Sequence, residues 1–352
     1  MLFWSHDQRE RGLRAIDTIY TVRTIAAGDV PSPLEQAEPL AFGFDIDAHM
    51  ARQCNAGLIV LHEGRVRLER YARGYGAVGR WTSFSVAKSI ISTLVGTAIR
   101  DGAIGSVVDR VADYLPGLAG SAYHDVTLHQ LLTMTSGVAW NEAYDDPAAD
   151  VARFWYQTPG PDVDLTVAYM RKLVKVAPAG TVWHYNTGET NLLGAAVASA
   201  TGQTLSAYLS NKLWHPLGME RDACWILGAG GAEVAGCCIS ASLRDYARFG
   251  QFILDGGRID GRSILPDGWM ETATTCQADI GEPGHGYGYQ WWTNADGSFD
   301  ARGIFGQGIF IDPACRLVIA SSGNWPNAVE PDTLGPERQQ FYRAVRALID
   351  AN

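Results

Sequence analysis

Residues 84–102 of this 352-residue chain, FSVAKSIISTLVGTAIRDG, decide the fold. The apolar side chains of this stretch recur at helical spacing: Val86, Ile90, Ile91, Leu94, Val95 and Ile99. Asp101-Gly102 is typical of the end of a helix. The stretch therefore predicts a strongly apolar helix that begins at about Ser85.

Strand patterns lie on both sides of this helix. Residues 58–62 and 66–71 flank Glu63-Gly64 and predict a β-hairpin. Apolar or alternating runs return after about residue 280, at 287–292, 308–311 and 317–321. Between the two groups, residues 110–265 are mostly helices and loops, and a last helix is expected over 336–351.

This order predicts an α+β fold, in which an antiparallel sheet flanked by helices is built from both ends of the chain. A mainly helical domain is inserted between them. We expect a sheet domain of residues 1–110 and 270–352, a helical domain of residues 111–269, and an active site at their interface.

The composition narrows the classes of partner. A net charge of −10 argues against nucleic acid and against anionic membranes. No run of about 18 apolar residues is present. The six cysteines show no CxxC pair and no zinc spacing, so we expect six free, mostly buried thiols in a reducing compartment. Residues 1–14 lack the apolar segment of a signal peptide, and a cytoplasmic location is expected unless a leader was trimmed.

The chemistry is expected to centre on Ser85-Val86-Ala87-Lys88, an S-x-x-K motif. A serine at a helix N-terminus lies where backbone N–H groups and the helix dipole favour negative charge. Lys88 lies on the same helix face, and the apolar residues that follow would desolvate its ammonium and favour the neutral base. With four lysines in the chain, a chance match is the competing explanation. The chain has no G-x-S-x-G, H-E-x-x-H, Walker A or complete G-x-G-x-x-G motif, and we expect no metal and no cofactor.

Three segments carry a resemblance to a known family: residues 84–89 (FSVAKS), 114–116 (YLP) and 131–137 (LLTMTSG). They resemble the β-lactamase-like serine hydrolases, which include class C β-lactamases, DD-peptidases, family VIII esterases and nylon-oligomer (6-aminohexanoate-dimer) hydrolases. The resemblance covers about residues 55–345. Residues 118–123 and 141–147 are similar to the nylon-oligomer branch in particular.

The resemblance implies roles for individual residues. Ser85 is the nucleophile, and Lys88 and Tyr185 handle its proton. Tyr185 matches the tyrosine of the family's Y-x-N element, but Thr187 stands where β-lactamases carry asparagine. Whether the nearby Asn191 compensates is open.

The family's K-T-G element aligns with residues 301–303 (ARG), of which Gly303 survives. The backbone N–H of Ile304, with that of Ser85, then forms the oxyanion hole. The lysine that binds a β-lactam carboxylate is missing, and Arg302 is expected on the wrong face of the strand to replace it. Tyr144 matches a tyrosine that contacts the scissile amide nitrogen, with packing at the pocket rim as its alternative.

We therefore expect a serine hydrolase that cleaves ester or linear amide bonds of small substrates through an acyl-enzyme on Ser85. Thr187, Gly303 and Tyr144 are the candidate substrate-binding residues. The alternatives are a β-lactamase or D-peptidase, and a catalytically silent member that binds a ligand. Which of Lys88 and Tyr185 takes the serine proton is left open, as is the oligomeric state, a homodimer included.

Overall fold

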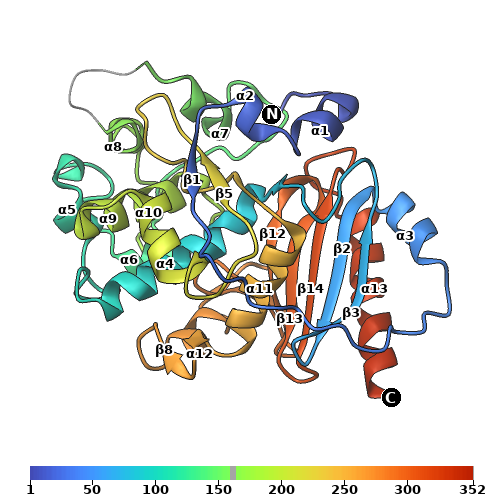
Figure 1. The fold of residues 1–352 in the computed structure, drawn as a ribbon. Coiled ribbons are helices and arrows are strands. Elements are labelled where there is room, and N and C mark those ends of the chain that lie inside the picture. The colour runs from blue at the N-terminus through green and yellow to red at the C-terminus, as the bar shows by residue number, and fades with distance from the viewer. Residues whose placement is uncertain (159–163, 352) are drawn as a thin grey trace.

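The computed structural model describes residues 1–158 and 164–351. Its largest sheet has eight antiparallel strands in the order β3-β2-β14-β13-β12-β11-β10-β9. The strands are β2 Asn55–His62, β3 Arg65–Tyr71, β9 Ala278–Asp279, β10 His285–Tyr287, β11 Trp292–Asn294, β12 Phe299–Gly303, β13 Gln307–Asp312 and β14 Leu317–Gly323. Strand β2 pairs with β14, so the sheet joins the two ends of the chain, as the sequence predicted (Figure 1).

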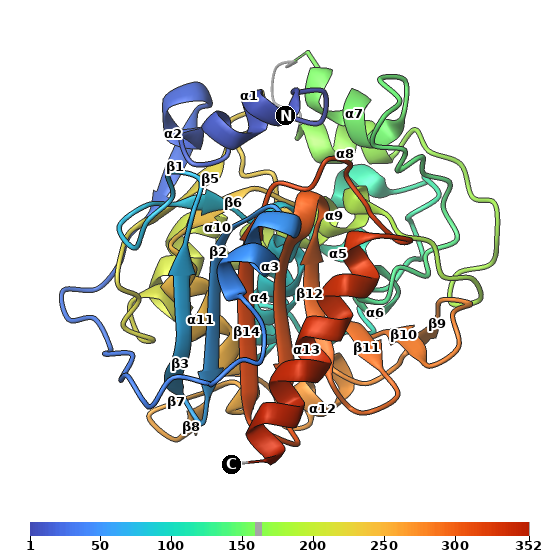
Figure 2. The same ribbon diagram turned by 90° about the vertical axis from the view of Figure 1, so that its right-hand side faces the viewer.

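Helices cover both faces of this sheet. Helix α13 (Leu334–Asp350) lies over one face, where Phe341, Tyr342 and Val345 pack on apolar side chains of β2, β13 and β14 (Figure 2). Helix α11 (Leu243–Leu254) packs on the other face, against β14 and β2. Strand β2 is buried throughout except at His62, because both of its faces are covered.

The remaining helices form a layer beside the sheet (Figure 1). They are α4 Ala87–Arg100, α5 Val111–Tyr114, α6 Leu128–Leu132, α7 Asp150–Arg153, α8 Leu165–Met170, α9 Thr187–Thr201, α10 Leu205–Leu209 and α12 Trp269–Ala273. Outside this layer, α1 His6–Gly12 and α2 Ile16–Ile19 lie near the N-terminus, and α3 Ile46–Arg52 packs on β2. Helix α4 is the predicted apolar helix, and it is buried from Ala87 to Ala98. The α+β fold class is confirmed, whereas the boundaries of the two domains stay a prediction.

A second sheet was not predicted. It has four short antiparallel strands in the order β1-β5-β6-β4: β1 Val22–Ile25, β5 Ala223–Ile226, β6 Ile239–Ala241 and β4 Trp81–Thr82. Strands of two to four residues, three of them buried throughout, are too short to show a period in the sequence. This sheet matters for the site because β4 leads directly into the turn that carries Ser85.

The strand predicted over residues 287–292 is instead two strands with a turn between them. Gly288 approaches the backbone so closely that a Cβ would lie 2.1 Å from the Ala273 carbonyl oxygen. Gln290 has a φ of +61° and its side-chain nitrogen donates to the carbonyls of Leu131 and Leu132. The aromatic sequence of residues 287–292 does not indicate this turn, because the turn is stabilised by hydrogen bonds to a helix that is distant in the sequence.

Among the helices of residues 1–158 and 164–351, none combines the length and the apolar character needed to cross a membrane.

Candidate active site

Ser85 lies in a tight turn between β4 and α4. The turn is a single 3-10 helix, Phe84–Val86, in which Phe84 has a φ of +43°. Two hydrogen bonds tie its start to β6: the Ser83 N–H donates to the Ile239 carbonyl (2.7 Å), and the Ile239 N–H donates to Ser83 Oγ (3.1 Å). Ser85 is thus placed at the beginning of a buried helix by a strand that is distant in the sequence.

Lys88 is held by three acceptors, none of which is charged. Its Nζ donates to Ser85 Oγ (3.0 Å), to Thr187 Oγ1 (3.0 Å) and to the Gly236 carbonyl oxygen (2.8 Å). The residue is 1% exposed. Burial lowers the pKa of Lys88 to about 8, although the charge of Glu142 opposes the shift. A measurable fraction of neutral amine is therefore present at neutral pH, within reach of the serine hydroxyl.

Tyr185 lies beside Lys88, just before helix α9. Lys88 Nζ is 5.2 Å from the centre of its ring, and the ring stacks on Trp292. Burial, and then the charge of Glu142, raise the pKa of Tyr185 well above its ordinary value, with only a hydrogen bond to Ser85 opposing them. The phenol therefore stays protonated and can donate a proton or a hydrogen bond.

Glu142 is the residue that the sequence analysis missed. Its carboxylate accepts hydrogen bonds from Thr187 N (3.0 Å), Thr187 Oγ1, Tyr144 Oη (3.0 Å) and Trp140 Nε1. Thr187 is the first residue of α9, so the carboxylate also lies at a helix N-terminus, where negative charge is stabilised. The segment NEAY, residues 141–144, was noted for its resemblance, but only the fold shows that its glutamate meets Thr187 and, through it, Lys88.

Thr187, which stands at the position of the family's asparagine, contacts Lys88. Its hydroxyl accepts from Lys88 and donates to Glu142. Asn191 acts one step away: its Oδ1 accepts from the N–H of Gly236 (2.7 Å), the residue whose carbonyl accepts from Lys88.

The end of strand β12 forms the opposite wall. A Cβ at Gly303 would lie 2.4 Å from the Ser83 carbonyl oxygen, so only glycine allows this approach to the serine turn. Ile304 follows and shares two pockets with Ser85. This brings the two residues predicted to form the oxyanion hole to one place.

Arg302 is already engaged by a neighbouring carboxylate. Its Nη2 donates to Asp300 Oδ2 (3.0 Å), and its guanidinium lies 5.0 Å from the centre of the Trp292 ring. The residue borders the wider pocket that contains Ser85, but it shares a strand face with Asp300, which is paired with Phe310 under helix α13. That Arg302 is on the wrong face to replace the missing lysine stays a prediction.

Two pockets meet at Ser85, Tyr144 and Ile304. The narrower one, about 300 Å³, has a wall that is mainly apolar: Phe84, Trp140, Phe154, Trp155, Leu227 and Val234. The wider one, about 980 Å³, includes four carboxylates: Glu142, Asp145, Glu282 and Glu330. Three tryptophans, Trp140, Trp292 and Trp325, line these pockets, while Trp291 is buried against Phe249.

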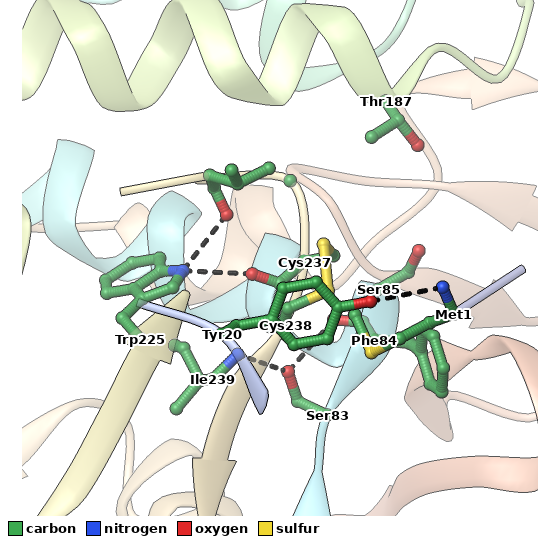
Figure 3. The surroundings of a disulfide bond; sticks show 12 residues. Met1, Tyr20, Ser83, Phe84, Ser85, Thr187, Trp225, Cys237, Cys238 and Ile239 are labelled. Carbon is green, nitrogen blue, oxygen red and sulfur yellow. Dashed lines mark hydrogen bonds between the residues drawn. A yellow bond between two sulfur atoms is a disulfide. The ribbon is translucent and has the colours of Figure 1, made fainter. Parts of the chain in front are cut away.

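The cysteines require a correction. Cys237 and Cys238 form a disulfide between neighbours in the chain, in the wall of the apolar pocket beside Ser85 (Figure 3). The prediction of six free thiols is therefore wrong for this pair. The spacing of the cysteines does not reveal this pair, which lies on a loop between the buried strands β5 and β6. The other four, Cys54, Cys224, Cys276 and Cys315, are free.

Known proteins resemble this chain over most of its length. The family model described as Beta-lactamase matches residues 45–342. The 6-aminohexanoate-dimer hydrolase of Paenarthrobacter ureafaciens is 31% identical over 305 residues, which are 82% of this chain and 76% of that protein.

Solved structures show the same fold. A Bacillus anthracis protein named as a 6-aminohexanoate-dimer hydrolase superposes with a TM-score of 0.84 at 24% identity, over 96% of this chain and 93% of its own. A family VIII carboxylesterase superposes with a TM-score of 0.63 at 19% identity, over 85% and 96% of the two chains. Since the family model spans most of the sequence and the relative from Paenarthrobacter is similar over most of both chains, this chain belongs to the beta-lactamase family.

Proposed function

We propose that this protein is a serine hydrolase that cleaves carboxylic ester or linear amide bonds of small substrates through an acyl-enzyme on Ser85. One observation carries the proposal: the buried Lys88 amine, whose pKa is lowered to about 8, lies 3.0 Å from Ser85 Oγ. A nucleophilic serine needs a base of this kind within hydrogen-bond reach.

In the first step neutral Lys88 takes the proton of Ser85 as Oγ attacks the substrate carbonyl carbon. The ammonium that forms keeps its bonds to Thr187 and to the Gly236 carbonyl, and the charge of Glu142 stabilises it from behind Thr187. The developing oxyanion is held by the backbone N–H groups of Ser85 and Ile304.

In the second half of acylation Tyr185 donates a proton to the leaving oxygen or nitrogen, and Lys88 restores the phenol. Water then attacks the acyl-enzyme with the same groups acting in reverse, and the acid leaves. We assign the base to Lys88 rather than Tyr185 because burial lowers the pKa of the amine but raises that of the phenol.

The two pockets can hold different parts of the substrate. The apolar pocket suits an acyl chain, and the wider pocket with its carboxylates suits a polar leaving group, amines included. The Paenarthrobacter relative is named for an amide substrate, and Tyr144, hydrogen-bonded to Glu142, lines both pockets here. A β-lactam is disfavoured because the only cation of residues 301–303 is paired with Asp300.

The test is turnover of p-nitrophenyl acetate and butyrate by the wild type and Ser85→Ala. We expect p-nitrophenol release by the wild type and only background release by the variant. A panel of linear amides and nitrocefin then separates amidase from lactamase activity. Full activity in Ser85→Ala would refute the nucleophile, and an inactive wild type would favour the ligand-binding alternative.

We further propose that the protein acts on a small molecule, binds neither nucleic acid nor a membrane, and is cytoplasmic. A homodimer is compatible with this function. The net charge of −10 supports the absence of a nucleic-acid partner. Cell fractionation and light scattering of the purified protein check the location and the oligomeric state.

A further inference from the structure

The Cys237–Cys238 disulfide lies in the wall of the apolar pocket, and the mechanism above does not use it. Cys238 is 1% exposed, whereas Cys237 is partly exposed. Figure 3 shows the bridge beside Ser85 and the ring of Tyr20. A small reductant that enters the pocket therefore reaches the bridge by the same route as a substrate.

The loop that carries the bridge also holds the catalytic groups. On one side of it, the Gly236 carbonyl accepts from Lys88. On the other, the Cys238 N–H donates to the Phe84 carbonyl (3.3 Å), one residue before the nucleophile. The loop is anchored by Trp225, whose Nε1 donates to the Cys237 carbonyl (2.9 Å; Figure 3). The loop therefore contacts both Lys88 and the serine turn.

The backbone of Cys238 has a φ of +74°, in the left-handed region that residues other than glycine rarely adopt. A ring closed by a disulfide between neighbours restricts both residues and holds this conformation in place. Opening the ring removes this restraint from Cys238, whose N–H bonds to the serine turn and which lies two residues after the Gly236 carbonyl that binds Lys88.

We propose that Cys237–Cys238 is a redox modification site of this hydrolase, active as the disulfide and slowed as the dithiol. This inference rests on the proposed function, because it concerns regulation of the same site. The reductant is a dithiol. One of its thiolates attacks the Cys237 sulfur, and Cys238 leaves as a thiolate. The second thiol of the reductant then releases Cys237, so that two electrons and two protons pass to the pair and the reductant leaves as a disulfide.

Two kinetic effects are expected on reduction. The maximal rate falls about tenfold, the usual effect of losing one hydrogen bond to a charged group. The acid limb of the pH–rate profile moves to lower pH. Losing the Gly236 acceptor favours the neutral amine and so lowers the pKa of Lys88. General loosening of the fold would lower the rate without moving this limb.

The experiment compares p-nitrophenyl butyrate hydrolysis before and after treatment with dithiothreitol, with the thiols counted by alkylation and mass spectrometry. We expect two additional alkylated thiols, a slower rate with the shifted limb, and recovery on reoxidation. Cys237→Ser/Cys238→Ser mimics the open form and should be slow and insensitive to dithiothreitol. Cys276→Ser is the matched control, since Cys276 is free and exposed, and it should behave as the wild type.

A second readout does not depend on the substrate. The rate at which a fluorophosphonate labels Ser85 should fall on reduction, and prior labelling should protect the bridge from the dithiol. If the double variant does not fold, reversible reduction of the wild type decides alone. Unchanged rates and labelling after complete reduction, or faster rates, would overturn the redox inference while leaving the hydrolase assignment intact. Failure of the hydrolase assignment is recognised separately: the oxidised wild type would then hydrolyse p-nitrophenyl butyrate no faster than Ser85→Ala.

Discussion

Lys88, which is buried beside the serine, and Arg302, which is partly exposed in the wider pocket, have opposite surroundings. Lys88 bonds only to neutral oxygens, from Ser85, Thr187 and Gly236, and its pKa falls to about 8. Burial also lowers the pKa of Arg302, but the charge and hydrogen bonds of Asp300 raise it by more, so the net shift is upward. Uncharged partners allow a buried amine to lose its proton and act as a base. A carboxylate partner keeps a cation charged and hydrogen-bonded.

The carboxylate that acts on Lys88 is that of Glu142, which does not bond to the amine directly. It accepts from the Thr187 hydroxyl, which in turn accepts from Lys88. At that position it moderates the fall in the pKa of Lys88 without pairing with it. The following substitutions test this contrast, from the largest expected effect to the smallest.

Lys88→Met should lower kcat/KM for p-nitrophenyl butyrate by about 10²–10⁴-fold, the range for loss of a general base. Arg302→Met should lower it by less than about tenfold, because the guanidinium is already occupied by Asp300. Steady-state kinetics of the two variants measure the difference. Equal losses would show that the two cations do not differ in role.

The pH dependence follows from the same shift. Lys88 must be neutral to act, so kcat/KM should rise with pH up to a pKa of about 8 and then level off. Below that pH the rate should fall about tenfold per pH unit. A profile that still rises through pH 10 would contradict a desolvated lysine as the base.

Glu142→Gln should move the acid limb of this profile to lower pH, because the charge that raises the pKa of Lys88 is gone. The plateau should fall by about tenfold, since Thr187 loses a charged acceptor. Asp145→Asn, which removes a charge from the same wider pocket, is the matched control and should leave the limb in place. A limb that both variants shift equally would indicate a general effect of charge.

Stability should change in the opposite sense to activity. The pKa of Lys88 in the folded protein, about 8, lies below its ordinary value of 10.5, so the folded state binds fewer protons between these values. The cost of burying the amine is therefore fully present below pH 8 and disappears as the pH rises to 10.5. Lys88→Met should be more stable than the wild type at pH 7, by about 1 kcal/mol after the lost hydrogen bonds are subtracted.

Arg302→Met should instead be less stable, by about 3 kcal/mol, because Asp300 is left buried without its partner. Urea unfolding at pH 7 and pH 10 measures both variants. The lysine variant should lose its advantage at the higher pH, and a constant advantage would mean that repacking, not the charge, is responsible.

Prediction from the sequence was most successful for features that depend on local spacing. The 3.6-residue period identified α4, and the distance of three residues placed Ser85 and Lys88 on one face of its start. The hairpin at Glu63-Gly64 and the last helix were found in the same way. The likeness to a family added Tyr185, Thr187 and Ile304, which the structure brings to the same site, while their catalytic roles stay predictions.

Prediction failed where the partners come from distant segments. The chain alone does not show that Glu142 meets Thr187, that the turn at Gln290 is held by α6, or that β5 and β6 bring Cys237 and Cys238 beside the nucleophile. Helical period and motif spacing act between residues a few places apart, so the amino-acid order determines them directly. The acceptors of Lys88, the occupancy of Arg302 and the position of the disulfide depend on burial and on contacts across the fold, and these exist only once the sheets and helices have packed.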